Sequence, residues 1–402
     1  MFDLGSTGFM LIATSLVMLM TPGLAFFYGG LVSKKNVLTI MMQSYVSMAI
    51  TTVLWYLVGY SLCFSGDVGG VIGNLNMACL HGVTPSTLLS SKDQIPLIIF
   101  IAYQMMFAII TPALITGAFA DRVSFKAYLI FLIVWQLFVY FPLVHMVWGG
   151  GILQKWGVLD FAGGIVVHAS AGMAALASVL FVGKRREKST IAHSIPMVAL
   201  GTGLLWFGWY GFNAGSELRV DGITGLAFLN TDIAASFAAA TWMLFDWVKY
   251  KKPKFTGLLT GAVAGLATVT PGAGYISTNS AVIIGIISCC VCYFVVESKN
   301  KYGIDDALDV FGVHGAGGIL GTILLGVFAS KAVNAAGADG LLLGNGSFFA
   351  KEVISVVGAG LYAFLFTYGM LFLINKITPV RVSEQEENLG LDASLHGEKA
   401  YQ

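Results

Sequence analysis

Charged residues are scarce in this sequence of 402 residues. Only 11% are Asp, Glu, Lys or Arg, and 57% are apolar, whereas charged residues make up roughly a quarter of an ordinary soluble domain. The mean hydropathy is +0.81. A chain of this composition cannot cover a water-exposed surface, so we exclude a soluble globule and predict an integral membrane protein. The net charge of +1 is uninformative, because the placement of the charges matters more than their sum.

Other features are missing as well. The five cysteines lack the spacing of a metal site, and three of them lie in the apolar run around "CCVC", where cysteine is expected as a small buried hydrophobe. A Cys63–Cys79 disulfide stays open as an alternative to two free thiols. The opening residues "MFDLGSTG" contain no Lys or Arg, so we expect no cleavable signal peptide. The apolar runs do not alternate with polar residues, which argues against membrane-spanning strands.

Long apolar runs are what the sequence has in abundance. A helix needs ~20 residues to cross the hydrocarbon core of a bilayer. Eleven such runs begin near residues 7, 37, 95, 125, 162, 195, 224, 256, 279, 311 and 353. The runs near 256, 279 and 311 are the least clear, because they are rich in glycine and interrupted by Pro271. We predict an all-α integral membrane protein with eleven transmembrane helices.

The positive charges are distributed unevenly over the predicted loops. If the N-terminus lies outside, 5 of the 22 Lys and Arg residues fall in outer segments and the other 17, Lys188 among them, fall in inner segments. The five are Lys92, Lys155, Arg219, Lys331 and Lys351. The positive-inside rule then predicts a multi-pass protein of the cell (inner or plasma) membrane, with an outer N-terminus and a cytoplasmic C-terminus.

Two distant segments resemble each other. "GLAFFYGGL" (23–31) aligns with "GWYGFNAGS" (208–216), with Gly, Phe and Gly at three matching positions. Spans one to five would then correspond to spans six to ten. Because five is odd, the two halves would face opposite ways, and inverted repeats place a substrate path between them. We predict a membrane domain over 1–380, with repeat halves at about 7–183 and 195–330 and a last span at about 353–376.

Few ionisable residues fall within the predicted spans. Asp160 and His168 begin and end "DFAGGIVVH", and His314 lies in the tenth span. Less clear cases are His145, Asp232, Asp246 and Asp309. Such a group costs several kcal/mol at membrane depth unless it is paired or hydrated, which makes it a candidate functional residue. Asp160 is expected to cap the fifth helix and to attract cations, and His168 should lie ~12 Å further along that helix.

The two histidines occupy corresponding spans of the two halves, so their rings could meet. Burial without a counter-ion favours neutral imidazole, which has one donor and one acceptor nitrogen. Such a pair suits a small polar neutral molecule or a proton passed along an apolar tube. Two other interpretations stay open, namely a hydrogen bond that only joins helices, and axial ligation of a haem in a membrane oxidoreductase.

Six motifs occur in order along the chain: "MTPGLAFFYGGLV", "HMVWGGG", "LDFAGGIVVH", "LLWFGWYGFNAGS", "DVFGVHGAGG" and "GLDASLHGEKAY". Together they closely resemble the ammonium transporter family, which includes methylammonium permeases and Rhesus proteins, over essentially the whole chain. Trp148 and Ser216 favour the bacterial and archaeal ammonium transporter branch over the Rhesus branch. His168 argues against the fungal members that carry an acid at this position.

The resemblance implies roles for individual residues. Trp148, Phe107 and Ser216 match an outer recruitment site for ammonium, and Asp160 supports its entrance. Phe107 and Phe212 match a stacked gate below it, and His168 and His314 match the twin histidines of the pore. A cation above an aromatic ring gains ~0.5–2 kcal/mol, although such rings could instead serve only in packing.

Two positions near these motifs call for separate expectations. Pro112 follows the gate residue Phe107 by five positions, frees a backbone carbonyl and is expected to kink the helix. Asp121 stands where the family often has Glu, and a capping or salt-bridge role at the inner end is expected.

The hydrophilic segment 381–402 is predicted to be either a disordered tail or, as the resemblance implies, a cytoplasmic regulatory tail. Its residues that match the family motif are Gly390, Leu391, Asp392, His396, Gly397 and Tyr401. The resemblance implies that this tail packs under the bundle and helps to bind PII signal-transduction proteins. It also implies a homotrimer in which each protomer has its own pore, with no cofactor, no metal and no nucleic-acid partner.

The resulting prediction is a non-enzymatic ammonium uptake protein with net transfer of charge. Ammonium (or methylammonium as its analogue) would be recruited outside and deprotonated, and ammonia would pass the two histidines. The alternatives are an ammonium sensor that signals through its tail, the haem oxidoreductase, and an ion-coupled transporter of a larger amine. Sensors of this family usually carry an appended signalling domain, and we expect none after residue 402 here.

Overall fold

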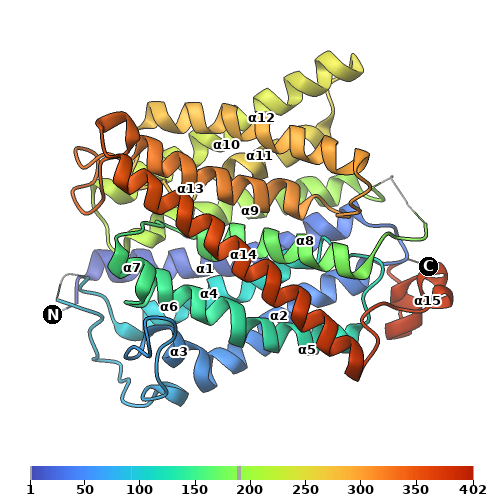
Figure 1. Ribbon diagram of the computed structural model, residues 1–402, viewed down its shortest axis with the longest axis horizontal. Helices are drawn as coiled ribbons and strands as arrows, with labels where there is room; N and C mark the ends of the chain where they lie inside the picture. Colours follow the sequence, from blue (N-terminus) through green and yellow to red (C-terminus); the bar gives the residue numbers. More distant parts are fainter. Residues whose placement is uncertain (1, 92, 188–191, 402) are drawn as a thin grey trace.

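The computed structural model describes residues 2–91, 93–187 and 192–401. Lys92 and Lys188, counted above among the outer and inner charges, lie outside the described residues. Long helices run side by side through the molecule, with the N-terminus at one end and the C-terminus at the other (Figure 1). Following the predicted orientation, we call the end with the N-terminus the outer end and the opposite end the inner end.

The helices that make up the bundle are α1 (Leu4–Leu31), α2, η1 and α3 (Val37–Leu54, Trp55–Gly59, Tyr60–Phe64), α4 (Leu97–Ile115), α5, η3 and α6 (Phe125–Trp135, Gln136–Tyr140, Phe141–Trp148), η4 and α8 (Gly164–Ala169, Ser170–Val182), α9 (Ile195–Ala214), α10 (Gly222–Tyr250), α11 (Phe255–Val269), α12 (Thr278–Lys301), η6 and α13 (Phe311–Gly315, Ala316–Phe328) and α14 (Gly346–Ile377). Short helices connect or follow them, namely η2 (Ala78–Leu80), α7 (Ile152–Trp156), η5 (Gly215–Glu217), η7 (Leu341–Leu343), α15 (Glu384–Leu389) and η8 (Asp392–His396). The described residues contain isolated β-bridges but no strand.

The predicted spans agree with these helices. Within the described ranges, 10 helical segments are long and apolar enough to cross a membrane. The eleventh apolar helix is α11, which has 15 residues. It ends just before Pro271, which has no N–H group to continue the helical hydrogen bonds. The prediction of an all-helical membrane protein is therefore confirmed, and α11 is the short member of the set.

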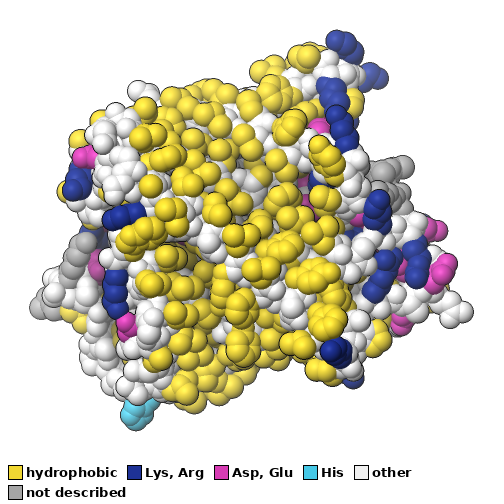
Figure 2. All heavy atoms as spheres, viewed as in Figure 1, with side chains coloured by type: hydrophobic (Ala, Val, Ile, Leu, Met, Phe, Trp, Pro, Cys, Tyr) yellow, Lys and Arg dark blue, Asp and Glu magenta, His cyan; other side chains and the backbone are white. Residues whose placement is uncertain are grey.

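The surface carries a broad apolar band. Figure 2 shows hydrophobic side chains over the middle of the visible face, with charged side chains gathered toward its two ends. Large apolar side chains on α14 point outward, and Leu365 and Phe372 are exposed. A soluble monomer rarely exposes so extensive an apolar surface, whereas a bilayer solvates it.

Local sequence signals determine where several helices begin. The Asp221 carboxylate accepts the backbone N–H groups of Ile223 and Thr224 and forms a capping box with Thr224 at the start of α10. The Ser383 hydroxyl and the Glu386 carboxylate form a second box at the start of α15. Such boxes satisfy backbone donors that have no partner within the helix.

Glycines bring α1 and α9 into close contact. A Cβ atom added at Gly23 would lie 2.9 Å from Leu204 Cβ, and one at Gly208 would lie 2.6 Å from the carbonyl oxygen of Leu16. Both positions belong to the two segments that align with each other in the sequence. Each matched segment therefore packs against the earlier part of the other helix, 23–31 on α9 and 208–216 on α1, because neither glycine has a side chain to hold the helices apart.

The cysteines act as separate thiols. Cys63 is buried and free, and Cys79 is exposed and free. The Cys63–Cys79 disulfide that the sequence left open is thus not formed.

In α4, Pro112 cannot donate to the carbonyl of Ala108, and the Gln136 side chain donates to that carbonyl instead at 2.7 Å. The bond to Gln136 holds α4 against η3 next to the proline.

Candidate functional site

A cavity of about 430 Å³ opens at the outer end of the bundle. The four residues that the sequence predicted for the recruitment site, Phe107, Trp148, Ser216 and Asp160, all line it. They come from α4, α6, η5 and the loop before η4, so the fold brings together four distant segments. Acidic side chains, Asp93 among them, also lie at this cavity.

Trp148 forms one wall of the cavity. It is the last residue of α6, and its indole N–H donates to the carbonyl oxygen of Asp160 at 2.8 Å. Its ring meets Phe107 edge-on, with the centroids 6.0 Å apart and the planes at 90°. Ser216 lines the same cavity. Its hydroxyl donates to the carbonyl of Phe212 at 2.9 Å, which leaves the lone pairs of Ser216 Oγ able to accept a hydrogen bond.

Asp160 caps the η4 helix, as expected. Its Oδ1 accepts the N–H groups of Gly163 and Gly164, and its Oδ2 accepts those of Ile165 and Val166, at 2.7 to 3.2 Å. Burial raises the pKa of this carboxyl, and the four N–H groups act against that by stabilising the charged form. Since both oxygens are occupied, Asp160 can act on a cation in the cavity through its field and its backbone, rather than as a direct ligand.

Below the cavity, two phenyl rings close the way into the bundle. Phe107 and Phe212 stack with their centroids 4.2 Å apart, and both are almost fully buried. Tyr103 packs edge-on against Phe107 at 5.0 Å, and its hydroxyl donates to backbone carbonyls of α9, including that of Phe212 at 2.8 Å. The sequence analysis missed Tyr103, which supports both rings of the predicted gate.

The histidines meet directly beneath these rings. His168 Nδ1 and His314 Nδ1 lie 3.3 Å apart, and the Phe212 ring is 6.0 Å from that of His168. Trp209, which the sequence did not single out, stacks on His168 at 5.4 Å. A small apolar cavity of about 10 Å³ borders both histidines, which is close to the space that one water molecule needs.

Two glycines allow the histidines to approach. Gly172 in α8 and Gly315 in η6 touch so closely that a Cβ atom at Gly172 would lie 2.1 Å from the Cα atom of Gly315. His168 precedes Gly172 by one helical turn, and His314 is next to Gly315. Both histidines also lie in π-helical turns, η4 and η6, which occur frequently at functional sites.

Asp306, in the second half of the chain, caps the start of η6 much as Asp160 caps η4. It precedes His314 by the same eight residues that separate Asp160 from His168. Its carboxylate accepts the N–H groups of Val310, Phe311 and Gly312 at 2.9 to 3.4 Å. The sequence analysis considered only Asp309 in this stretch.

Asp309 lies beside this cap and has a different partner. Its Oδ1 is 2.5 Å from Lys299 Nζ, and Lys299 is also 3.7 Å from Asp306 Oδ2. The inner cap thus has a lysine next to it, whereas no ion pair of Asp160 is found in the described part of the chain.

The other ionisable residues considered above have structural partners. His145 is buried between the carbonyl of Cys63 at 2.9 Å and the carboxylate of Asp67 at 3.1 Å. Hydrogen bonds from Lys155 first, and then from His145, lower the pKa of Asp67 to about 2. Asp232 accepts from Tyr210 at 2.6 Å. These residues join segments to each other and lie away from the line of Phe107, Phe212 and the two histidines.

The tail is ordered and docks on the inner end. The Asp392 carboxylate accepts the N–H groups of Leu38 and Thr39 at the start of α2, at 3.0 and 2.8 Å, where a negative charge is favourable. The N–H of Leu391 donates to Asn36 Oδ1 at 2.7 Å. Gly390 has a φ of 99° and packs against Lys35.

The remaining tail residues of the predicted set also make contacts. The His396 ring lies edge-on to Phe125 at 5.0 Å, and Gly397 has a φ of 67° where η8 ends. The Tyr401 hydroxyl is 3.0 Å from His193 Nε2. Segment 381–401 is therefore a folded extension of the bundle.

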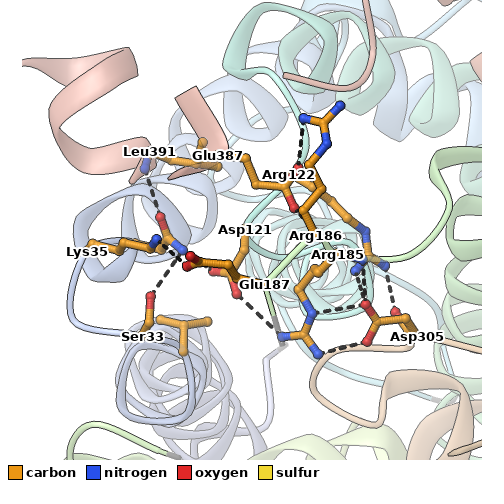
Figure 3. Close-up of polar contacts among 12 residues, drawn as sticks. Ser33, Lys35, Asp121, Arg122, Arg185, Arg186, Glu187, Asp305, Glu387 and Leu391 are labelled. Atoms are coloured by element: carbon orange, nitrogen blue, oxygen red, sulfur yellow. Dashed lines mark hydrogen bonds and ion pairs between the residues drawn. The ribbon is translucent and has the colours of Figure 1, made fainter. Parts of the chain in front are cut away.

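Ion pairs connect the loops at the inner end, close to the tail. Figure 3 shows the Arg185 side chain between Asp121 and Asp305, at 3.4 and 2.8 Å. Arg122, fully buried, pairs with Asp305 at 3.0 Å. Burial alone would raise the pKa of Asp305, but Arg185 and Arg122 hold it well below its ordinary value. Asp121 therefore has the predicted salt-bridge role, and Asn36 links it to the tail by a 2.6 Å hydrogen bond.

The geometry contradicts the haem interpretation. The facing nitrogens of His168 and His314 are 3.3 Å apart and their rings stack at 22°, so a planar macrocycle cannot lie between them. Among the described residues, no group of three or more His, Cys, Asp or Glu could hold a metal ion. The arrangement is suited to the passage of a small molecule or a proton.

The helical bundle, its apolar band and the cavity that leads to a buried polar pair define a membrane transport protein. A model of the Ammonium Transporter Family matches residues 8–401. The chain belongs to the ammonium transporter family, whose members are transporters and not enzymes.

Known relatives agree over the full length. An ammonium transporter of Bacillus subtilis (strain 168) is 46% identical over 404 residues, which is 100% of this chain and 99% of that protein. The crystal structure of Saccharomyces cerevisiae Mep2 is similar with a TM-score of 0.90 at 34% identity, covering 98% of this chain and 90% of that one. A structure described as a sensor Amt protein has a TM-score of 0.88 at 28% identity and covers 98% of both chains.

Proposed function

We propose that this protein takes up ammonium across the cell membrane. Ammonium collects in the outer cavity, loses its proton near the phenyl rings, and crosses the bundle as ammonia past the two histidines. The observation that carries this proposal is the continuous order of the cavity, the stacked Phe107 and Phe212 rings, and the His168–His314 contact. The names of the relatives support ammonium as the substrate.

The outer cavity has the chemistry to hold a small cation. The indole ring of Trp148 and the phenyl ring of Phe107 offer aromatic surfaces, which attract a cation. Ser216 Oγ can accept a hydrogen bond from one of the four N–H groups of ammonium. Moving the ion out of water disfavours its charged form. Loss of the proton at the bottom of the cavity therefore becomes easier than in water.

The histidine pair offers a route for the released proton. Because two nitrogens 3.3 Å apart face each other, one must donate and the other accept, and a proton added from one side can leave on the other. Ammonia needs no charge compensation in the small apolar cavity. Proton and ammonia together amount to a net transfer of one positive charge.

The test is the current that an ammonium pulse evokes in proteoliposomes at several pH values. We expect a charge displacement that saturates with ammonium concentration in the wild type. Trp148→Leu should raise the half-saturation concentration by roughly 2- to 30-fold, because it removes a cation–π contact of ~0.5–2 kcal/mol. Trp156→Leu, at the end of α7 and not among the residues that line the cavity, is the control for loss of a tryptophan.

Two results would count against the proposal. If the wild-type protein showed no ammonium-dependent charge movement, the proposal of electrogenic uptake would be refuted. An unchanged concentration dependence in Trp148→Leu, with normal current in the control, would remove Trp148 from the recruitment site.

Orientation and assembly form part of the proposal. We propose an outer N-terminus and a cytoplasmic C-terminus, two inverted repeats of five spans, and a homotrimer with one pore in each protomer. The equal spacing of Asp160 to His168 and of Asp306 to His314 supports the repeats, as do the reciprocal contacts of Gly23 with α9 and of Gly208 with α1.

We propose further that the docked tail forms part of the surface that binds a PII signal-transduction protein. In a pull-down with PII, the variant lacking residues 382–402 should lose most of the binding, because it lacks α15, η8 and their contacts. The control is His81→Ala, which removes an exposed side chain from a loop at the outer end and should bind normally. Equal PII affinity of the truncated and full-length proteins would refute this role for the tail.

A sensing function is a second candidate, because a structure described as a sensor Amt protein is similar over 98% of both chains. The ammonium pulse separates the two candidates. A sensor would bind ammonium and change the position of its tail without sustained substrate flux.

A further inference from the structure

One acidic residue inside the bundle has no role in the scheme above. Glu352 lies on α14, in the second turn after its start at Gly346, and it is fully buried. Its Oε1 accepts the backbone N–H of Leu159 at 2.7 Å. Its Oε2 has no hydrogen-bond partner within the described residues. A carboxyl group buried in this way is costly, so its single contact calls for an explanation.

The contact joins α14 to the loop that carries Asp160. Residues 157–163 form no regular helix between α7 and η4, so their backbone donors need partners elsewhere. Leu159 N–H donates to Glu352, and Phe161 N–H donates to the carbonyl of Pro271 at 3.0 Å. These two bonds flank Asp160 on both sides. Of the two acceptors, only that of Glu352 is a side chain.

The residue between these two bonds, Asp160, binds Trp148 through its backbone carbonyl. The carbonyl of Asp160 accepts the Trp148 indole N–H at 2.8 Å, so the position of the aromatic wall depends on the position of this carbonyl. Glu352 itself packs closely against α13. A Cβ atom added at Gly326 of α13 would lie only 3.3 Å from Glu352 Cβ. Glu352 is thus rigidly placed and one residue removed from the acceptor of Trp148.

We propose that Glu352 is a positioning residue of the outer site, which sets the orientation of Trp148 through the Leu159–Asp160 backbone and thereby the affinity for the substrate cation. The inference rests on the proposed function, because it assumes that Trp148 binds ammonium. It assigns to α14, the helix outside the two proposed repeats, a part in substrate recognition.

The test measures the half-saturation concentration of the ammonium-evoked current. Glu352→Met keeps the volume of the side chain but removes the acceptor, and we expect a rise of roughly fivefold, as for loss of one buried hydrogen bond. Glu352→Ala should give a similar rise. Glu352→Gln keeps an acceptor oxygen and should stay within about twofold of the wild type. Ser355→Ala, also buried and one turn further along α14, is the control and should leave the half-saturation concentration unchanged.

A double-mutant cycle separates positioning from general loosening. If Glu352 acts through Trp148, Glu352→Met should cause little further change in a Trp148→Leu background, because coupled residues are not additive. An equal fold-change in both backgrounds would overturn the inference, and so would a Gln variant as impaired as the Met variant. If Glu352→Met does not fold, Glu352→Ala takes its place in the cycle, and failure of both to fold would assign Glu352 to stability and overturn the inference as well.

The same data distinguish this inference from the function on which it rests. If Trp148→Leu raises the half-saturation concentration and the Glu352 variants do not, only the positioning role is refuted. If Trp148→Leu itself has no effect, the recruitment site and the role of Glu352 are refuted together.

Discussion

His168→Ala should reduce the ammonium-evoked current by roughly 100-fold, the size of effect typical for removal of a positioned proton-transfer group. His168 Nδ1 faces His314 Nδ1 at 3.3 Å, so alanine removes the proton partner of the second ring at this nitrogen. The outer cavity contains neither histidine among its lining residues, so uncharged methylamine flux that remains should keep its half-saturation concentration. The measurement is current and tracer uptake from the same proteoliposome preparation.

The control for this variant is His81→Ala, which removes an exposed histidine of an outer loop. It should leave the current unchanged. Wild-type current and ion selectivity in His168→Ala would exclude the histidine pair from the proton route. Loss of uptake together with loss of a monodisperse protein would instead indicate a folding defect, and His168→Asn, which keeps a polar side chain, would then replace it.

Asp160→Ala should strongly destabilise the protein. Its carboxylate accepts four backbone N–H groups at the start of η4, and each buried donor left without an acceptor costs about 1–3 kcal/mol. We expect a loss of at least ~3 kcal/mol, a large part of the ~5–15 kcal/mol that stabilises a typical folded domain. The measurement is thermal unfolding of the purified protein in detergent.

Two further variants place this result in context. Asp306→Ala should destabilise to a similar degree if the two caps are counterparts, because it also leaves three backbone donors without an acceptor. Asp232→Ala, which removes a half-buried acceptor of two side chains, should cost less than ~1 kcal/mol. A melting temperature of Asp160→Ala equal to that of the wild type would show that the cap is dispensable.

Much of this architecture can be read from the sequence, because a bilayer imposes a strict rule on any chain that crosses it. Every span must satisfy its backbone hydrogen bonds internally and present apolar side chains, so hydropathy alone locates the helices. The motifs around Trp148, His168 and His314 added the outline of the site through their resemblance to one family. The short α11 shows the limit of the length criterion, since Pro271 ends it early.

What the sequence did not reveal depends on contacts between distant segments. Neither the meeting of Glu352 with Leu159 nor that of Gln136 with Ala108 leaves a pattern along the chain. Gly172 and Gly315 look like two of 49 glycines until the helices are placed. One signal was present but missed: "DFAGGIVVH" and "DALDVFGVH" both place an Asp eight residues before a His, and this spacing identifies Asp306.

The two capping carboxylates differ in their electrostatic surroundings. Each offsets the partial positive charge of a helix start, but Lys299 lies beside Asp306, whereas the described residues contain no ion pair of Asp160. An incoming cation thus meets a capping carboxylate alone at the outer cap, and a lysine flanked by two carboxylates, Asp306 and Asp309, at the inner cap, even though the two histidines between the caps are arranged almost symmetrically.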